Sequence, residues 1–312
     1  VDLFFGLGGN FVAAAPDTAV TSAAMARCRL TAQVSTKLNR SHTVVGDTAL
    51  ILPCLGRTER DVQAGGEQYV TVEDSMGMVH ASRGRLDPAS PDLRSEVAIV
   101  AGLAAATLGE RSDVDWAGFA SDYGHIRDHI EAVVPDFDRF NERSATLEGF
   151  ALPHPVRDTR SFPTASGKGR LTVNPLDVLE VPDGHLLLQT LRSHDQFNTT
   201  IYGLDDRYRG IHQGRRVVFA HADDLSALGL VDGQSVDLVG EPDTPGAAPR
   251  IAEAFRVVAY DVALGTCAAY FPEANVLVPL DSTAEASNTP TSKSVVVRLV
   301  ERVGPPPNRV GM

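Results

Sequence analysis

Residues 3–35 read LFFGLGGNFVAAAPDTAVTSAAMARCRLTAQVS, and this stretch indicates the fold class. The apolar run Leu3–Leu7 predicts a strand, and the turn signal Gly8-Gly9-Asn10 closes it. Asp17 then provides an N-cap for an alanine-rich helix, and Leu30–Val34 is a second apolar strand. A strand, a helix and a strand at this spacing predict a parallel sheet with a right-handed crossover.

The alternation of strand-like and helix-like stretches continues to about residue 150. Ala49–Leu52 predicts a third strand, and the apolar spacing from Ser95 to Leu108 predicts an amphipathic helix. We therefore expect an α/β Rossmann-like domain over residues 1–150. Residues 151–183 are rich in proline and glycine and lack a helical period, so they are expected to form a linker.

The second half of the chain has the pattern of a small, mostly-β domain. Gly and Asp turns separate short apolar runs, which predicts a closed β-barrel over residues 184–303, and the proline-rich residues 304–312 predict an extended tail. A short helix is expected at 222–228, ended by Gly229. The predicted strands are His185–Thr190, Arg216–Ala220, Ser235–Val239, Ala254–Tyr260, Ala274–Pro279 and Ser294–Val300.

Composition and charge exclude several classes of function. The chain of 312 residues has 28 Lys and Arg against 40 Asp and Glu, a net charge of −12, which argues against nonspecific nucleic-acid binding. No apolar run approaches the ~20 residues of a transmembrane helix. The three cysteines, Cys28, Cys54 and Cys267, lie far apart, which excludes a disulfide scaffold and a cysteine-ligated zinc or iron–sulfur site within these residues. The start at Val1, without an initiator Met, leads us to expect a longer protein that lacks its N-terminal part here.

Two segments carry the strongest binding signals. Residues 190–200, TLRSHDQFNTT, follow an apolar strand and hold the densest set of hydrogen-bond donors in the chain. Arg192 can bind an oxyanion through two N–H groups, and Phe197 offers a stacking surface. The turn Gly6–Asn10 could hold an anion on its backbone amides, but it lacks the GxGxxG pattern. An ordinary polar surface loop and an ordinary tight turn are the alternatives for these two segments.

The residues also fail to form a complete catalytic set. His125 and His129 are four residues apart but lack the Glu of HExxH, and there is no GxSxG or Walker A sequence. Cys54 follows an apolar strand and could act as the nucleophile of a hydrolase, with a buried structural thiol as the alternative. The chain has glycines and hydrogen-bond donors at the ends of its predicted strands but no complete set of catalytic residues. This combination is typical of part of a cofactor pocket.

Several motifs in their order resemble the C-terminal portion of the molybdopterin oxidoreductases, the dimethyl sulfoxide reductase superfamily, over nearly all of residues 1–303. The motifs are Leu7–Asn10 (LGGN), Ala49–Pro53 (ALILP) with Glu59, Phe162–Leu171 (FPTASGKGRL), Ala274–Leu277 (ANVL) and Thr289–Lys293 (TPTSK). Within this family, Ser35–His42 (STKLNRSH) and Leu191–Gly203 (LRSHDQFNTTIYG) resemble the branch similar to the formate dehydrogenase alpha subunit.

This resemblance implies a fold and a cofactor. The fold would be a Rossmann-like α/β parallel-sheet domain followed by a double-psi β-barrel, the molybdopterin dinucleotide-binding domain. The cofactor would be molybdenum or tungsten held by two molybdopterin guanine dinucleotides. In the family, the residue that ligates the metal and the cysteines of any iron–sulfur cluster lie N-terminal to this segment. The resemblance therefore implies no catalytic residue and no metal ligand within the chain, which we expect to be inactive alone.

The resemblance also implies cofactor contacts by residues that match family positions. Gly9 and Asn10 would contact one guanine dinucleotide from the first turn, and Arg60 would suit a pyrophosphate. Thr36 stands where a carboxylate is usual, and Glu96 stands where Asp is usual. The complete set is Gly9, Asn10, Ser35, Thr36, Arg60, Glu96, Thr190, Arg192, Ser193, His194, Gln196, Phe197, Asn198, Thr199, Tyr270, Asn275 and Lys293.

The expected function is two-electron redox chemistry of the formate dehydrogenase type in the cytoplasm, with this chain as the cofactor-binding part. Its partners would be the missing N-terminal domains, a small-molecule substrate such as formate, and an electron-transfer protein, with no nucleic acid and no membrane span. A noncatalytic binding or adaptor module is the alternative, because double-psi barrels also serve in that role. One arrangement distinguishes the two interpretations. If the turn at Gly9 and Asn10, the segment around Arg192, and Arg60 line one cleft, the cofactor interpretation holds; if they face opposite sides of the molecule, it fails.

Overall fold

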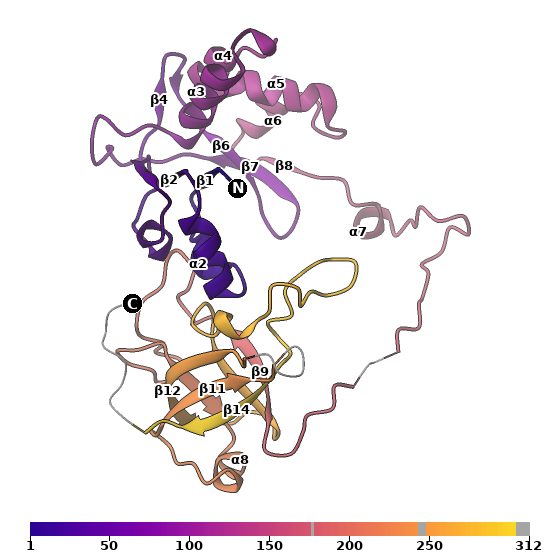
Figure 1. Ribbon diagram of the computed structural model, residues 1–312. Helices are drawn as coiled ribbons and strands as arrows, with labels where there is room; N and C mark the ends of the chain where they lie inside the picture. The colour runs from indigo at the N-terminus through magenta and orange to yellow at the C-terminus, as the bar shows by residue number, and fades with distance from the viewer. Residues whose placement is uncertain (176–177, 243–247, 304–312) are drawn as a thin grey trace. The chain divides into compact units, whose positions relative to one another are not determined.

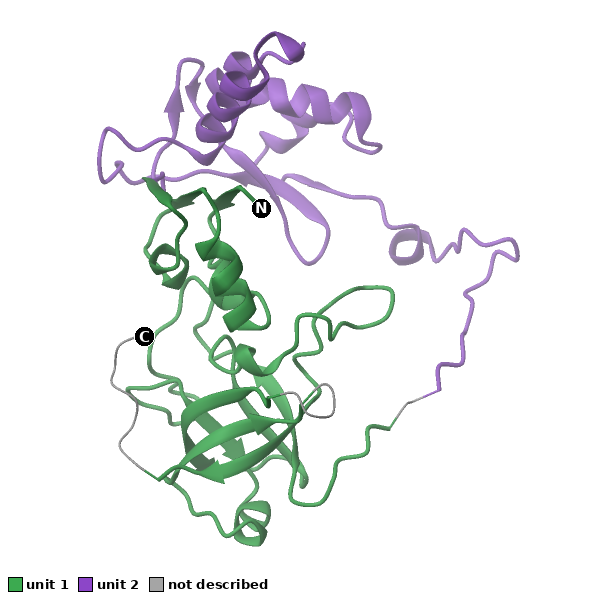
Figure 2. Cartoon of the chain, viewed as in Figure 1, with its two compact units in different colours: residues 1–52, 178–312 green, residues 53–177 purple. Residues whose placement is uncertain are grey.

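The computed structural model describes residues 1–175, 178–242 and 248–303 (Figure 1). The chain forms two compact units (Figure 2). Val1–Leu52 and Val178–Met312 make one, which we call the barrel unit, and Pro53–Asp177 make the other, which we call the helical unit. The predicted domain boundaries at residues 150 and 183 stay a prediction. The compact units are defined by contacts in space, and one of them joins Val1–Leu52 to Val178–Met312. The expected tail at residues 304–312 lies outside the described residues.

The start of the barrel unit confirms the predicted strand, helix and strand. Its elements are β1 (Leu3–Leu7), α1 (Phe11–Ala14), α2 (Thr18–Ala26), β2 (Leu30–Ser35), the 3-10 helix η1 (Arg40–Thr43) and β3 (Thr48–Pro53). β1 and β2 pair in parallel, with Leu3 opposite Leu30 and Leu7 opposite Val34, in a sheet of order β1-β2-β3. The side chain of Asp17 accepts a hydrogen bond from the Val20 amide, so it caps α2 as expected. The expected Rossmann-like parallel sheet is thus confirmed only in the small sheet of β1, β2 and β3.

The rest of the barrel unit forms a closed barrel with strand order β10-β12-β11-β14-β9-β13. This confirms the predicted barrel and most of its predicted strands. The barrel elements are β9 (Leu186–Leu191), β10 (Val217–Ala220), α8 (Ala222–Ala227), β11 (Ser235–Gly240), β12 (Ile251–Ala259), β13 (Thr266–Tyr270), the 3-10 helix η3 (Asn275–Leu277) and β14 (Val295–Glu301). Gly229, with φ +70°, follows α8, since glycine adopts the left-handed conformation that ends a helix.

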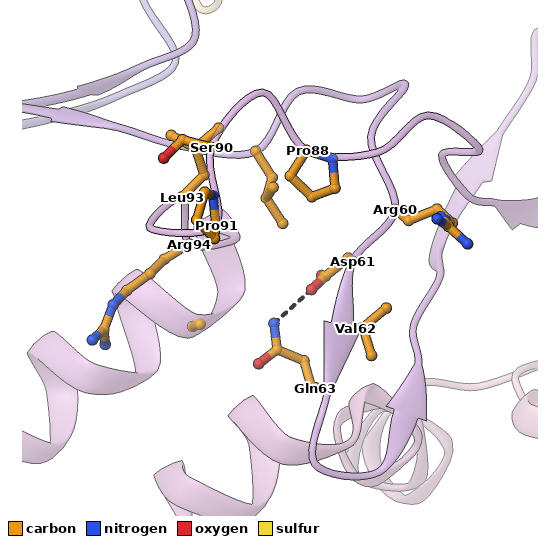
Figure 3. A pocket seen from close by; sticks show the side chains of 11 residues that line it. Arg60, Asp61, Val62, Gln63, Pro88, Ser90, Pro91, Leu93 and Arg94 are labelled. Atoms are coloured by element: carbon orange, nitrogen blue, oxygen red, sulfur yellow. Dashed lines mark hydrogen bonds between the residues drawn. The ribbon is translucent and has the colours of Figure 1, made fainter.

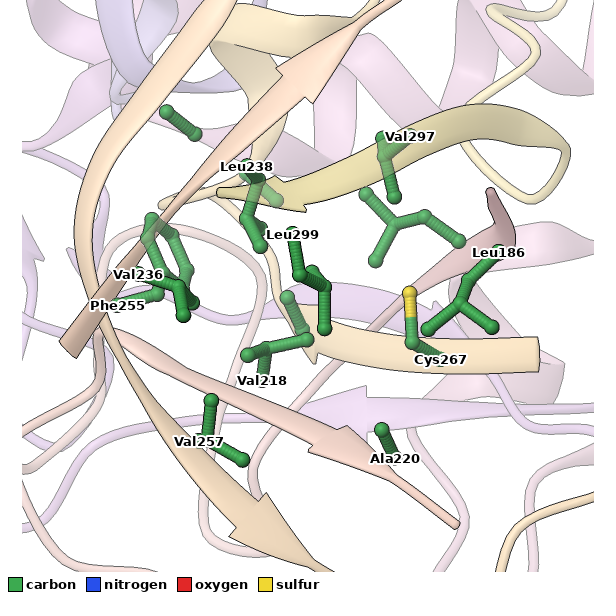
Figure 4. Packing of buried hydrophobic residues seen from close by; sticks show 14 of the residues in the cluster. Leu186, Val218, Ala220, Val236, Leu238, Phe255, Val257, Cys267, Val297 and Leu299 are labelled. Carbon is green, nitrogen blue, oxygen red and sulfur yellow. The ribbon is translucent and has the colours of Figure 1, made fainter. Parts of the chain in front are cut away.

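The barrel interior is filled by apolar side chains from its strands (Figure 4). Leu188 of β9, Val218 of β10, Leu238 of β11 and Phe255 of β12 are all fully buried. Inward residues alternate with outward ones along β9 and β12, which is the period expected of a strand with one face in a core. This closed core supports the loops at the barrel ends.

One predicted strand is wrong. Residues 274–279 contain the 3-10 helix η3 rather than a strand, and the strand that completes the barrel is β13, at Thr266–Tyr270. A short apolar run does not distinguish a buried strand from a buried turn. β13 contains two alanines and has little strand propensity of its own, but β9 and β10 flank it on its two sides and supply its hydrogen-bond partners.

The helical unit combines helices with short antiparallel strands. Its strands are β4 (Val62–Gln63), β5 (Gly66–Glu67), β6 (Val70–Glu73), β7 (Met78–Ser82) and β8 (Phe150–Ala151), and its helices are α3 (Glu96–Leu108), the 3-10 helix η2 (Gly109–Arg111), α4 (Trp116–Ser121), α5 (Tyr123–Val133), α6 (Phe140–Ser144) and α7 (Pro155–Thr159). The predicted helix at 95–108 is confirmed, with Ser95 as its N-cap. Among the described residues, no helix has the length and apolar character needed to cross a bilayer.

Candidate functional site

The segment from Arg192 to Thr199, which we call the donor loop, follows β9 at one end of the barrel. Its buried residues recur every third position, at Ser193 and Thr199, with the half-buried Gln196 between them. The other side chains of the loop, those of Arg192, His194, Asp195, Phe197 and Asn198, are exposed. The loop is therefore held from the inside while it presents a guanidinium, an imidazole, a carboxylate, an aromatic ring and an amide to the outside, and the carboxylate, that of Asp195, lies 3.7 Å from Arg207 Nε.

Arg215 holds the centre of the donor loop. Its guanidinium donates to Ser193 Oγ over 2.6 Å and to Gln196 Oε1 over 2.8 Å. The same group forms an ion pair with Glu273, Nε to Oε1 at 2.7 Å and Nη2 to Oε2 at 3.2 Å. The Arg215 side chain is 4% exposed, and its charge is compensated by Glu273. One buried cation thus joins the donor loop to the segment that follows β13.

Asn10 holds the far end of the donor loop. Its Nδ2 donates to the backbone oxygen of Thr199 over 2.8 Å, and its Oδ1 accepts from Ser41 Oγ over 3.1 Å. The Nδ2 of Asn39 also donates to the oxygen of Gly9 over 2.9 Å. The turn after β1 and the donor loop therefore lie side by side, which brings together two segments that the sequence places far apart.

The exposed side chains of the donor loop keep unused hydrogen-bonding capacity. Arg192 donates from Nη2 to Asn198 Oδ1 over 3.2 Å, which leaves its other guanidinium donors for a ligand. His194 stacks on Tyr208 with ring centroids 3.7 Å apart, and its imidazole makes no hydrogen bond within the described part of the chain. Asn198 has φ +47°, a left-handed conformation that asparagine tolerates better than most residues.

Asp206 organises the neighbouring loop, which carries Tyr208. Its carboxylate accepts hydrogen bonds from Tyr270 Oη over 2.8 Å and from Arg209 Nη1 over 2.6 Å. Burial acts to raise the pKa of Asp206, but the hydrogen bonds from Tyr270 and Arg209 outweigh it, so the pKa lies below its usual value. The pKa of Tyr270 is raised, first by burial and then by its bond to Asp206. The ring on which His194 stacks thus sits on a loop built around an ionised carboxylate.

Tyr270, Asn275 and Thr190, which are among the residues predicted to contact the cofactor, are buried and bonded within the protein. Tyr270 is fully buried and bonded to Asp206. Asn275 is 2% exposed, and its Nδ2 lies 2.6–3.1 Å from the backbone oxygens of residues 13–15. Thr190 is 2% exposed, and its backbone oxygen accepts from Lys293 Nζ. Tyr270 and Asn275 make these bonds through their side chains and Thr190 through its backbone, and the expected contacts of all three with the cofactor stay predictions.

Ser35 and Thr36 lie at the end of β2. Ser35 Oγ is bonded to the backbone of Lys37, donating to its oxygen over 2.7 Å, whereas Thr36 is exposed. Gly9 is exposed in the turn after β1, and a Cβ at its position would meet no atom within 4 Å. The backbone turn at Gly9 is therefore open to a ligand.

Arg60 and Glu96 belong to the helical unit. Arg60 lines a cavity of about 460 Å³ together with Asp61, Gln63 and Arg94 (Figure 3). Asp61 accepts from Gln63 Nε2 over 2.5 Å and from the Tyr123 hydroxyl, while Arg60 pairs with Asp87. Glu96 is the exposed first residue of α3. The expected contacts of Arg60 and Glu96 with a dinucleotide stay predictions.

The structure argues against Cys54 as a nucleophile. Burial, with smaller contributions from Glu96 and Glu59, raises the pKa of Cys54 to about 11. The thiol is therefore protonated at neutral pH, and the thiolate is the nucleophilic form. The alternative of a buried structural thiol agrees with this environment.

The sequence analysis missed the residues that organise the site, which are Arg215, Glu273, Asp206 and Ser41. Arg215 and Arg216 stand together before β10, and nothing in their local pattern distinguishes the buried one from the exposed one. The sequence shows charged residues before the apolar run 217–220, but this holds for Arg215 and Arg216 alike and so does not identify the buried one.

With this geometry in hand, comparisons with known proteins identify the family. Residues 186–296 match the family described as "Molydopterin dinucleotide binding domain". The chain is 58% identical over 301 residues to an uncharacterized oxidoreductase of Mycobacterium tuberculosis. The aligned region covers 96% of this chain and 39% of that protein. The chain belongs to the molybdopterin oxidoreductase family. The matched molybdopterin domain contains the barrel strands β9 to β13, the first two residues of β14 and the donor loop.

The chain is also similar to other known proteins. Protein YdeP of Escherichia coli is 42% identical over 298 residues, 94% of this chain and 39% of that protein. This chain thus spans about two fifths of the length of these curated relatives. The structure of acetylene hydratase from Pelobacter acetylenicus has a similar fold, with a TM-score of 0.62 and 13% identity over 97% of this chain and 44% of that chain.

The residues of the donor loop fit a molybdopterin dinucleotide by their chemistry. Such a cofactor carries a pyrophosphate, and its binding requires donors and positive charge. Arg192 supplies the charge, and the exposed side chains of His194 and Asn198 supply further polar groups. Within the described ranges, no group of three or more His, Cys, Asp or Glu residues lies close enough to hold a metal ion. The positive charge and the donors of the loop fit the pyrophosphate of the cofactor.

Proposed function

We propose that this chain is the cofactor-binding part of a molybdenum or tungsten oxidoreductase that holds two molybdopterin guanine dinucleotides. The donor loop carries the proposal, because Asn10 and Arg215 anchor it while Arg192, His194 and Asn198 remain exposed. Anchored donors bind an anion at a lower entropic cost than mobile ones. This also explains how a chain of net charge −12 can bind a polyanion: the local donors decide, and the net charge does not.

Each part of the loop would have its own task in this function. Arg192 would neutralise a phosphate oxygen, and His194 and Asn198 would supply hydrogen bonds beside it. The open turn at Gly9 would let a second part of the cofactor approach the backbone. When bound, the cofactor would supply two-electron redox chemistry, while the residues of this chain bind and orient it.

The finer features of the proposal concern the whole protein. They are formate as the substrate, a metal-ligating residue and any iron–sulfur cluster in a part of the protein outside this chain, an electron-transfer partner, and a cytoplasmic location. The resemblance of residues 191–203 to the formate dehydrogenase branch supports the choice of formate. The low identity to acetylene hydratase supports the fold alone.

The test compares Arg192→Gln with Arg139→Gln in the natural full-length protein, purified from a host that makes the cofactor. Arg139 is an exposed arginine of the helical unit that pairs locally with Glu142. A charge-assisted hydrogen bond contributes roughly 1.5–3 kcal/mol, so Arg192→Gln should reduce pterin retention about tenfold or more. Arg139→Gln should retain the wild-type pterin content. Equal pterin content in both variants would contradict the role of the donor loop.

A second measurement addresses the reaction. The full-length protein should contain molybdenum or tungsten and reduce a dye with formate, whereas the 312-residue chain alone should do neither. Stoichiometric metal and formate-dependent turnover in the 312-residue chain would overturn the proposal that it is only the cofactor-binding part.

A further inference from the structure

Arg215 contacts two segments that are distant in the sequence. It lies two residues before β10 and bonds to Ser193 and Gln196 of the donor loop. It also bonds to the backbone oxygen of Phe271, 3.0 Å away, and to Glu273. Gln196 reaches the same Phe271 oxygen through its Nε2 over 2.9 Å. The donor loop and the segment after β13 are therefore joined through one guanidinium.

The surroundings of Arg215 favour this one arrangement. The guanidinium carbon lies 4.3 Å from the ring centroid of Tyr202 and 4.8 Å from that of Tyr270, distances typical of cation–π contacts. Its planar fork matches the Glu273 carboxylate, which a lysine ammonium cannot reproduce. With the side chain 4% exposed, water cannot readily replace these partners.

We propose that Arg215 is the positioning residue of the donor loop. By fixing Ser193 and Gln196 on the inner side, it keeps Arg192, His194 and Asn198 on the outer side, where they meet the cofactor. This inference rests on the proposed function of the donor loop as a cofactor site. Arg215 itself does not touch the cofactor, because its donors already bind protein atoms.

The experiment uses the full-length protein and the variants Arg215→Lys, Arg215→Gln and Arg216→Gln. Arg216 is the matched control, because it is the adjacent arginine and is exposed, and within the described residues its side chain makes one hydrogen bond, to the backbone oxygen of Glu253 over 2.6 Å. Three quantities are measured: amide hydrogen exchange of residues 192–200, amide exchange of β11 as an internal reference, and pterin content after purification.

In Arg215→Lys, exchange of residues 192–200 should rise about tenfold or more while β11 stays protected, because the lost bonds hold the loop locally. Pterin content should fall by a similar factor. Arg215→Gln should show larger effects, since it leaves the Glu273 carboxylate without its cation. Arg216→Gln should match the wild type in all three quantities.

The outcomes separate this inference from the proposed function. If exchange of residues 192–200 rises and pterin content stays unchanged, Arg215 positions the loop as inferred, but the loop is not the cofactor site. If pterin content falls without a local rise in exchange, or if exchange rises equally in β11, Arg215 is not a positioning residue. Should Arg215→Gln fail to fold, Arg215→Lys and Glu273→Gln decide by the same measurements, and wild-type exchange in both would overturn the inference.

Discussion

The side-chain amide of Asn10 donates a 2.8 Å hydrogen bond to the backbone oxygen of Thr199, across 189 positions of sequence. Asn10 is 3% exposed, and its Oδ1 accepts from Ser41, so both of its polar groups are bonded inside the barrel unit. Asn10 was predicted to contact the cofactor; the structure places it where it joins the turn after β1 to the donor loop. This bond supports the cofactor interpretation over a simple surface loop, because it brings two of the predicted binding segments together.

Replacing Asn10 should destabilise the barrel unit. Asn10→Ala leaves the Thr199 oxygen without its donor and the proton of the Ser41 hydroxyl without its acceptor, which should cost about 1–3 kcal/mol of unfolding free energy. Asn10→Asp should cost more at pH 7, because a buried carboxylate would face the Thr199 oxygen. Urea unfolding measures both changes. Asn174→Ala, at an exposed asparagine, should change stability by less than about 0.5 kcal/mol, and an equal loss there would show that Asn10 has no special role.

The barrel core should respond strongly to the loss of one large side chain. Phe255 of β12 is fully buried, so Phe255→Ala removes a ring from a closed core and should cost about 3–5 kcal/mol. Val231→Ala, at a residue that is 66% exposed, is the control and should be nearly neutral. Thermal and urea unfolding provide the measurement. A Phe255→Ala protein as stable as the control would mean that this core is not closed as described.

The local pattern of the sequence was sufficient for elements that bury continuous apolar runs. Leu3–Leu7, Leu30–Ser35 and Val295–Glu301 are strands in the structure because their residues are apolar and their ends carry turn signals. Thr266–Tyr270 was missed because its strand character comes from pairing with β9 and β10 rather than from its own side chains. At residues 274–279 the local pattern favoured a strand, but this apolar run forms the buried 3-10 helix η3.

For the site, the sequence indicated which segment carries the donors but not how it is held. The chemistry of Arg192, His194 and Asn198 can be recognised from residue types alone. The bonds from Arg215 to Ser193 and from Asn10 to Thr199 depend on chain topology, which no local pattern encodes. The motif resemblance implies that Asn275 and Tyr270 bind the cofactor, and it does not indicate that Asn275 Nδ2 and the Tyr270 hydroxyl are bonded within the protein.

The loop around Asp206 should weaken in acid. The pKa of Asp206 is lowered in the folded protein, so its ionised form contributes stability above the unfolded pKa of about 4, and this contribution is lost as pH falls through the folded value. Asp206→Asn should therefore be less stable than wild type at pH 7, and the difference should shrink as the pH falls below about 4. Unfolding curves from pH 7 to pH 2 measure this. A stability difference between Asp206→Asn and wild type that stays constant from pH 7 to pH 2 would contradict the assignment.

Cys54 should be resistant to alkylation at neutral pH. Its pKa is raised from 9.0 to about 11, so at pH 8 its thiolate fraction is roughly a hundredfold lower than that of an ordinary thiol, and burial hinders access further. The raised pKa also means that the thiol form contributes stability below pH 9, and that this contribution is lost as pH rises from 9 towards 11. Iodoacetamide labelling followed by peptide mass spectrometry should show slow modification of Cys54 in the folded protein and rapid modification in urea. Cys54→Ser should leave the cofactor-dependent activity unchanged and should flatten the loss of stability between pH 9 and pH 11. Rapid labelling of Cys54 in the folded protein at pH 8, accompanied by loss of activity, would return this thiol to the candidates for a catalytic nucleophile.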